Sequence, residues 1–265
     1  MSFWVLLLLC VVQGLTEFLP VSSSGHLLLV EQVFGIEGDT LMLNLFLHLA
    51  TLLAVIVVYR KILWQLIKKP FQPLTYKLLV STVFTVILAL GYELLDLGRF
   101  GFKMYGFCFL ITSIVLMFTF IFQKRSTVVK TGDISYKSAI IVGIVQGFAV
   151  LPGISRSGST ISSLLLTGND EEKASEYSFL LSIPVILGGF MLELIKLIKG
   201  GGASNAFASI NPWLCVFAFI FTFFVAFASL KITLKLLKKH KFVFFAIYLF
   251  LLAIVVITLN FTIFK

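Results

Sequence analysis

Long apolar runs alternate with short polar segments along most of this chain. Six of the runs are close to the length of about 20 residues that a helix needs to cross the hydrocarbon core of a bilayer. We therefore predict six membrane-spanning helices, over residues 41–59, 77–97, 102–122, 176–198, 212–232 and 242–263.

Two further apolar regions, residues 3–34 and 138–167, are interrupted in the middle by a proline and a cluster of serine and glycine. The legs that follow the clusters, 26–34 and 159–167, have nine residues each, so a helix there would reach only about 14 Å. Non-helical backbone at membrane depth is tolerated where protein or a water-filled cavity satisfies it. We predict that each region is a re-entrant helical hairpin.

The two interrupted regions repeat one another at an offset of 133 residues. Gln13 and Gly25 are 12 positions apart, as are Gln146 and Gly158, and the predicted span 77–97 maps onto 210–230. The chain is therefore predicted to be one membrane domain made of two repeats, 1–125 and 134–265.

Each predicted repeat holds one hairpin and three spans. A hairpin returns to its starting side, and three crossings leave the second repeat upside down relative to the first. The predicted fold class is an all-α integral membrane protein with an inverted-topology repeat, an arrangement in which paired broken helices meet near the midplane.

Composition and charge agree with a membrane protein and orient it. Hydrophobic residues make up 59% of the chain, charged residues 12%, and the mean hydropathy is +1.07, which excludes a soluble globule of this size. The loops on one predicted side carry 15 Lys and Arg residues and those on the other carry 5. By the positive-inside rule, the basic side is cytoplasmic, and both termini and the mouth of the first hairpin face outside.

The net charge and the cysteines do not indicate nucleic-acid binding, a disulfide or a metal site. The net charge of +9 is explained by topology and by anionic lipid headgroups, so membrane lipids are expected partners and nucleic acid is not. Cys10, Cys108 and Cys215 are odd in number and widely spaced within apolar segments, which indicates buried thiols rather than a disulfide or a metal site.

Three ionisable residues fall at membrane depth, at or near the predicted hairpin tips. Glu17 and His26 belong to the first hairpin and Arg156 to the second. Charges at this depth are costly and point to function by default. The other reading of Glu17 and Arg156 is a buried ion pair that only holds the two hairpins together.

The polar clusters at the tips predict an anion site. Both half-helices would start there and direct their N-terminal N–H groups at one region, and Arg156 offers a planar fork for two oxygens of a phosphate. The alternative explanation for serine and glycine in membrane helices is that small residues let the helices pack closely. The predicted substrate-binding residues are Ser22, Ser24, Gly25, Ser155, Ser157, Gly158 and Thr160.

A phosphate site that also holds a hydroxyl, an imidazole and a carboxylate is suited to chemistry. A serine attacks phosphorus only with a base beside it, and His26 or Glu17 can be that base. Glu17 is alternatively a ligand for Mg²⁺ or Ca²⁺, with Gln13 one helical turn earlier on the same face. Such a donor set is weak and needs oxygens of the substrate to complete it.

These residues resemble the signatures of the bacterial undecaprenyl-diphosphate phosphatase family, also called the bacitracin-resistance family. The first signature is read from Gln13 through Glu17 to His26, and the second is Pro152-Gly153-Ile154-Ser155-Arg156-Ser157-Gly158-Ser159-Thr160. The resemblance covers the whole chain and includes the segment from Ala174 to Leu181.

The resemblance implies hydrolysis of the terminal phosphate of a polyprenyl diphosphate lipid in the bacterial plasma membrane, which regenerates the carrier for cell-wall synthesis. It implies that Glu17 is a metal or acid–base residue, Ser23 the nucleophile, His26 a base or acid, and Arg156 the diphosphate clamp. Many members have Glu where this chain has Gln13, so we expect weaker metal binding or altered acid–base roles here.

A secondary transporter or lipid flippase for a phosphorylated substrate is the alternative function, since inverted repeats with broken helices are common in transporters. A transporter needs an anion clamp but has no need for a serine beside both a histidine and a carboxylate.

Five ionisable residues are not predicted to form the site. We expect His48 to be satisfied within its helix and His240 to be solvated in a basic loop. Glu176 is expected in the first turn of its helix, where a carboxylate favours the dipole. Glu93 and Asp96 lie near the outer end of a span with no predicted partner.

Overall fold

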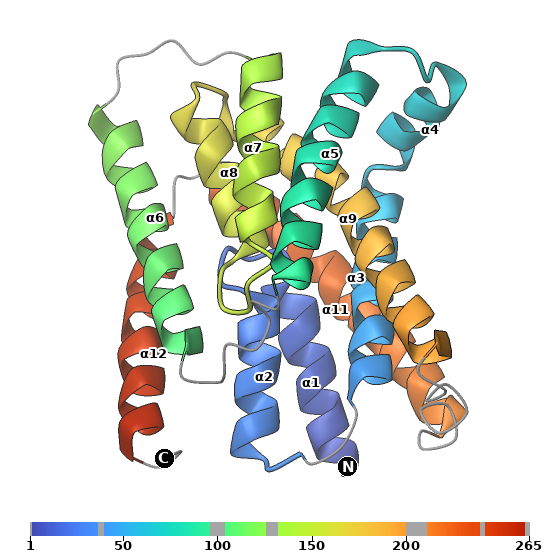
Figure 1. Ribbon diagram of the computed structural model, residues 1–265, viewed down its shortest axis with the longest axis vertical. Helices are drawn as coiled ribbons and strands as arrows, with labels where there is room; N and C mark the ends of the chain where they lie inside the picture. The colour runs from blue at the N-terminus through green and yellow to red at the C-terminus, as the bar shows by residue number, and fades with distance from the viewer. Residues whose placement is uncertain are drawn as a thin grey trace.

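The computed structural model describes residues 2–36, 40–95, 104–125, 132–199, 211–238 and 242–262, and these residues form helices joined by short connections (Figure 1). No strand occurs in the described part of the chain. The helices are α1 Phe3–Thr16, α2 Ser23–Val33, α3 Leu41–Val58, α4 Arg60–Lys68, α5 Pro73–Leu94, α6 Tyr105–Arg125, α7 Tyr136–Phe148, α8 Arg156–Leu166, α9 Glu171–Lys199, α11 Pro212–Lys238 and α12 Phe242–Thr262.

The predicted all-helical membrane protein is confirmed. Five helices, α5, α6, α9, α11 and α12, are long and apolar enough to cross a membrane. The predicted span 41–59 corresponds to α3, which continues into α4 after a bend of 77°. Taken as one crossing, the bent pair brings the number of spans among the described residues to six, and the amphipathic α4 turns away from α3 at the upper end of the molecule in Figure 1.

One span starts earlier than the apolar pattern indicates, and this corrects the place of Glu176. The Asp170 carboxylate accepts the backbone N–H of Lys173 at 2.7 Å and so caps α9, which begins at Glu171. Glu176 is therefore beyond the first turn, where it pairs with the Lys173 ammonium at 3.0 Å.

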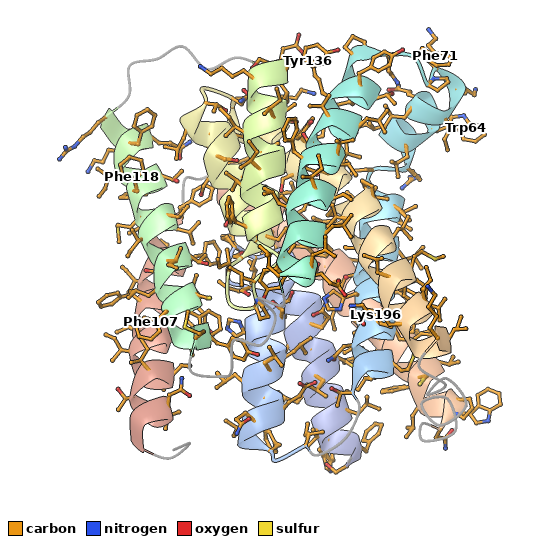
Figure 2. The ribbon with its side chains drawn as sticks, in the orientation of Figure 1. Trp64, Phe71, Phe107, Phe118, Tyr136 and Lys196 are labelled. Atoms are coloured by element: carbon orange, nitrogen blue, oxygen red, sulfur yellow. The ribbon has the colours of Figure 1, made fainter. Side chains whose placement is uncertain are left out.

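The outer surface of the bundle suits lipid. Phe107 and Phe118 project outward from α6, and Trp64 and Tyr136 lie at the same upper end of the molecule (Figure 2). Exposed tryptophan and tyrosine are typical of the interface between lipid and water. Many of the aromatic residues thus contact lipid rather than the core.

One acidic residue with no predicted partner has one in the structure. Glu93 of α5 accepts from the Lys196 ammonium of α9 at 2.6 Å, which ties the ends of two spans together. Asp96 and His240 lie outside the described residues.

The two interrupted regions form helical hairpins that approach each other from opposite ends of the molecule. Figure 1 shows α1 and α2 in its lower half, α7 and α8 in its upper half, and both tips at the centre. Each second leg, α2 and α8, has 11 residues, about 16 Å of helix, which is too short to cross a bilayer. The symmetry between the two halves of the chain stays a prediction.

A long helix from the other half of the chain holds each hairpin. Ser81 of α5 donates to the carbonyl of Ala139 in α7 at 2.7 Å, and Ser229 of α11 donates to the carbonyl of Leu15 in α1 at 2.8 Å. Gly143 of α7 lies so close to α5 that a Cβ there would be 2.5 Å from the Ser81 carbonyl oxygen. These contacts fix the first leg of each hairpin and so fix the tips.

Candidate functional site

The tip of the first hairpin ends in a serine cap. Ser22 accepts the backbone N–H of Gly25 through its Oγ at 3.4 Å, so α2 begins at Ser23, three residues before the predicted leg. Ser22 has φ +69°, the sole positive φ of a non-glycine residue among those described. A conformation of this kind costs about 1–3 kcal/mol and is concentrated at functional sites. Ser23 and Ser24 thus lie in the first turn of a helix, not before it.

The tip of the second hairpin is built in the same way. Ser155 caps α8 by accepting the N–H of Gly158 at 3.0 Å, and Arg156 is the first helical residue. The backbone N–H of Ser155 donates to Thr112 Oγ1 of α6 at 3.1 Å, and Thr112 also lies 3.3 Å from the carbonyl oxygen of Gly153. Nothing in the sequence pattern distinguishes Thr112, a hydroxyl on a long apolar span that holds the loop before Arg156.

The two tips touch, and an ion pair joins them. The Arg156 guanidinium donates to Glu17 Oε1, and Ser157 Oγ donates to the carbonyl of Leu19 at 3.1 Å. A Cβ on Gly25 would lie 3.0 Å from Gly153 Cα, so backbone meets backbone at this point. The structure therefore brings Glu17 and Arg156 together, as the sequence predicts.

Glu17 is the centre of the polar contacts. Its Oε2 accepts from Ser23 Oγ at 2.6 Å and from Gln13 Nε2 at 2.9 Å, and His48 Nε2 lies 3.8 Å from the same oxygen. The residue is 5% exposed. A buried carboxylate needs this number of partners to stay charged, because desolvation is expensive.

A cavity of about 150 Å³ lies between the tips. The serines of both caps and Arg156 line it, so the N-terminal turns of α2 and α8 border the same space. Helix N-termini and a guanidinium are groups that favour the binding of an anion. The full lining is Thr16, Glu17, Ser22, Ser23, Ser24, His48, Ala149, Ile154, Ser155, Arg156 and Ser157.

Three predicted binding residues do not line the cavity. The N–H groups of Gly25 and Gly158 are used by the serine caps. Thr160 is fully buried; it donates to the Arg156 carbonyl at 2.9 Å and lies 2.6 Å from Ser178 Oγ. These residues shape and pack the tips, and a direct contact of theirs with substrate stays a prediction.

His26 lies beside the cavity rather than in it. Its Nδ1 is 2.7 Å from the carbonyl oxygen of Ser22, and its Nε2 is 2.7 Å from the hydroxyl of Tyr248, on which the ring also stacks. A carbonyl only accepts, so Nδ1 carries the proton and the neutral ring accepts from Tyr248 at Nε2. Neither nitrogen is left for substrate, and a catalytic role for His26 stays a prediction.

His48 is the site residue that the sequence interpretation set aside. Its Nδ1 does bond within the helix, to the carbonyl of Asn44 at 2.7 Å, as expected. Its Nε2, however, faces Glu17, and the residue lines the cavity. The rule that selected Glu17, an ionisable group at membrane depth, applied equally to His48 and would have found it.

Gln13 and Glu17, the predicted metal ligands, already form a hydrogen bond with each other. Both oxygens of Glu17 already accept hydrogen bonds, and Gln13 turns its amide nitrogen toward Glu17, leaving a buried Oε1 with no partner. No group of three His, Cys, Asp or Glu side chains suited to a metal occurs among the described residues. Mg²⁺ and Ca²⁺ take six or more oxygen ligands, so Gln13 and Glu17 alone do not fit a protein-held ion.

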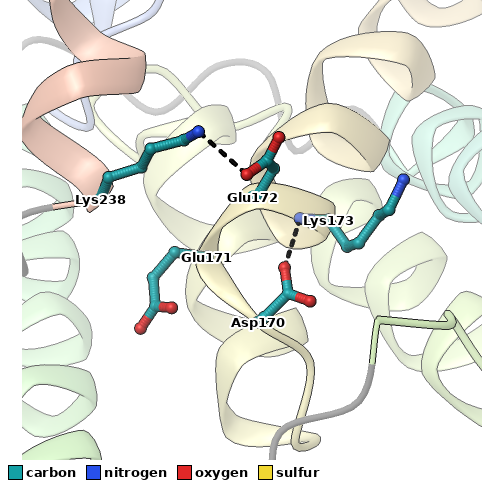
Figure 3. A pocket seen from close by; sticks show the side chains of 5 residues that line it. All are labelled: Asp170, Glu171, Glu172, Lys173 and Lys238. Carbon is teal, nitrogen blue, oxygen red and sulfur yellow. Dashed lines mark hydrogen bonds and ion pairs between the residues drawn. The ribbon is translucent and has the colours of Figure 1, made fainter.

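A larger hollow, of about 370 Å³, lies at the start of α9 (Figure 3). Its charged groups all have partners, some inside the hollow and some outside it, such as Gln123 for Glu171 and Glu176 for Lys173. Glu172 accepts from the Lys238 ammonium at 2.9 Å across to α11, and Asp170 caps the helix. This cluster fastens helix ends and shows no arrangement suited to a ligand.

Fold and site together define an integral membrane protein with a polar cavity between two hairpin tips at its centre. The chain belongs to the family described as bacitracin resistance protein BacA, whose profile matches residues 6–255.

Similar proteins share this full length. The chain is 36% identical to the undecaprenyl-diphosphatase of Carboxydothermus hydrogenoformans over 265 residues, covering 98% of each chain. It is 37% identical to the undecaprenyl-diphosphatase of Halothermothrix orenii over 263 residues, again with 98% of each covered. Undecaprenyl-diphosphatase 4 of Bacillus thuringiensis subsp. konkukian is 36% identical over 258 residues, with 96% of each covered.

Proposed function

We propose that this protein hydrolyses undecaprenyl diphosphate to undecaprenyl phosphate and inorganic phosphate, and so recycles the lipid carrier of cell-wall synthesis. The names of its relatives support this activity. The observation that carries it is the contact of one buried carboxylate, Glu17, with both a phosphate-binding guanidinium and a serine hydroxyl.

Binding uses the groups that surround the cavity. The diphosphate competes with Glu17 for the Arg156 guanidinium and takes two of its donors. The N-terminal turns of α2 and α8 face the same charge. The polyprenyl tail leaves the cavity for the lipid around the bundle, whose outer surface is apolar.

Ser23 is placed to attack the terminal phosphorus. Its hydroxyl already donates to Glu17 Oε2, so the proton passes to the carboxylate as the Oγ–phosphorus bond forms. The bond from phosphorus to the bridging oxygen breaks, and its electron pair stays on that oxygen, giving undecaprenyl phosphate. The terminal phosphate is then a phosphoserine, which water hydrolyses to inorganic phosphate.

The divalent cation, Mg²⁺ or Ca²⁺, belongs to the substrate in this proposal. It would enter with the diphosphate, whose oxygens would supply most of its ligands, and would neutralise charge on the leaving group.

The location follows the same reasoning. We infer the bacterial plasma membrane, with both termini on the outer side, because α1 begins and α12 ends at the lower edge of Figure 1 while the basic α4 lies at the upper edge. The positive-inside rule makes the basic edge cytoplasmic.

A flippase or transporter for the same lipid is the competing function, favoured by hairpins that enter from opposite ends. The contact between Ser23 and Glu17 favours hydrolysis, because transport requires no activated hydroxyl.

The test is phosphate release from a short-chain polyprenyl diphosphate by the purified protein in detergent, with Mg²⁺, with Ca²⁺ and with EDTA. We expect release by the wild type and none by Ser23→Ala. The matched control is Ser182→Ala, which removes a hydroxyl that bonds only within α9, to the Phe179 carbonyl. No release by the wild type under any condition would reject the enzyme, and near-normal release by Ser23→Ala would show that water attacks directly.

A further inference from the structure

His48 presents one uncommitted ring nitrogen to the cavity. Its Nδ1 lies 2.7 Å from the backbone carbonyl oxygen of Asn44, and a carbonyl only accepts, so Nδ1 carries the proton. In the neutral ring, Nε2 is then an unprotonated base. The bond to the helix backbone fixes both the tautomer and the orientation of the ring.

The surroundings of Glu17 show why a second base is needed. Hydrolysis through a phosphoserine releases two protons in turn, one from Ser23 and one from water. Ser23 Oγ has its acceptor in Glu17 Oε2 at 2.6 Å, and Glu17 Oε1 is held by Arg156. Once Glu17 has taken the first proton, it cannot take the second.

The other groups around the cavity do not meet this need. Both nitrogens of His26 are engaged, by Ser22 and Tyr248. The remaining described residues that line the cavity are a glutamate, an arginine, serines, a threonine and apolar residues. Among them, His48 alone has a ring nitrogen that can act as a base.

The distances place His48 next to the reacting atoms. His48 Nε2 lies 3.8 Å from Glu17 Oε2, the oxygen that also accepts from Ser23 Oγ. Base and nucleophile therefore flank one carboxylate oxygen, with the cavity beside them. A water molecule that attacks a phosphate on Ser23 has to lie in this cavity, within reach of Nε2.

We propose that His48 is the general base of the second half-reaction. This proposal rests on the proposed phosphatase activity and on its Ser23 step. Water forms its bond to phosphorus and gives a proton to His48 Nε2, while the bond from phosphorus to Ser23 Oγ breaks. Ser23 Oγ recovers its proton from Glu17, and the proton on His48 returns to solvent as inorganic phosphate leaves.

Glu17 gains a second function from this geometry. After it returns its proton to Ser23, it is an anion 3.8 Å from the protonated ring and stabilises that cation. Serine hydrolases also stabilise a protonated histidine with a carboxylate, although there the carboxylate contacts Nδ1 and here it faces Nε2.

The test is the fate of the terminal phosphate in His48→Ala, measured with lipid labelled at that phosphate. We expect one rapid turnover that releases about one undecaprenyl phosphate per enzyme, followed by a kcat lowered about 10²–10⁴-fold. Phosphoserine should accumulate at Ser23, identified by mass spectrometry of the quenched protein, with KM changed less than about threefold. Added imidazole should restore release of inorganic phosphate, because it fits the space left by the ring.

The matched control is Asn44→Ala, one turn earlier on α3. It removes the side chain that donates to Glu31 but keeps the backbone carbonyl that holds His48, so it should turn over like the wild type without accumulating phosphoserine.

Three results would overturn the proposal while leaving the phosphatase intact. These are normal kcat in His48→Ala, slow turnover with no phosphoserine, or slow turnover that imidazole leaves unchanged and that goes with a lower melting temperature. Absence of phosphate release by the wild type would instead reject the proposed function itself.

Discussion

Arg156 and Glu17, 139 residues apart in the chain, form an ion pair that joins the tips of the two hairpins. The glutamate side chain is 3% exposed and the arginine 20%, so one partner is buried and the other opens to the cavity. The pair thus joins the two hairpins, and in the proposed function it is also where the diphosphate binds.

Single and double substitutions at this pair should separate its two functions. Glu17→Gln or Arg156→Gln alone leaves an unpaired charge at the site, and we expect each to cost about 3–5 kcal/mol of folding free energy. The double variant removes both charges and should recover most of that loss while releasing no phosphate. Thermal unfolding in detergent and phosphate release measure the two effects. Activity in the double variant would mean that the pair only holds the hairpins.

Tyr248→Phe tests what His26 does. The change removes the hydroxyl that His26 Nε2 accepts from but keeps the stacked ring, so we expect a loss of about 1 kcal/mol in stability. If His26 acts by holding the first tip, kcat should stay within about threefold of the wild type. A fall of 100-fold or more at unchanged stability would instead support the catalytic role predicted from the sequence.

Gln13→Glu should make the site dependent on a divalent cation. The new carboxylate replaces the amide that donates to Glu17 at 2.9 Å, so two like charges face each other in a buried place. We expect a lower melting temperature in EDTA than the wild type has, and a rise with Mg²⁺ or Ca²⁺ that exceeds the wild-type rise. The control, Gln146→Glu, changes the matching glutamine of α7, which bonds Thr85 away from the cavity. Equal responses of the two variants to the ions would show that Gln13 has no special relation to a metal.

The sequence predicted the hairpins because their cause is local. A proline followed by serine and glycine favours the end of one helix and the start of another, and short legs cannot cross a bilayer. The apolar pattern predicts starts for α2 and α8 that are three residues late, because Ser22 and Ser155 are helix caps rather than loop residues. A serine before a serine or glycine cluster can be either a loop residue or a helix cap, and only the backbone conformation distinguishes the two.

The contact between His48 and Glu17 could not be predicted from spacing. It depends on how α3 packs beside the first hairpin and on the rotation of α3 about its axis. The hydrogen bond that was expected for His48 exists, and it leaves the other nitrogen free. The tautomer follows from the backbone, whereas the function of the ring follows from a neighbour distant in sequence.

The contact of the two tips has a consequence for how this protein varies. A Cβ on Gly25 would lie 2.5 Å from the Phe109 ring and 3.0 Å from Gly153 Cα, so a change at one tip forces a change at the other. In the proposed reaction, the first half of the chain supplies Ser23, Glu17 and His48, and the second half supplies Arg156. Neither half then forms a working site without the other, and a substitution at one tip has to be matched at the other.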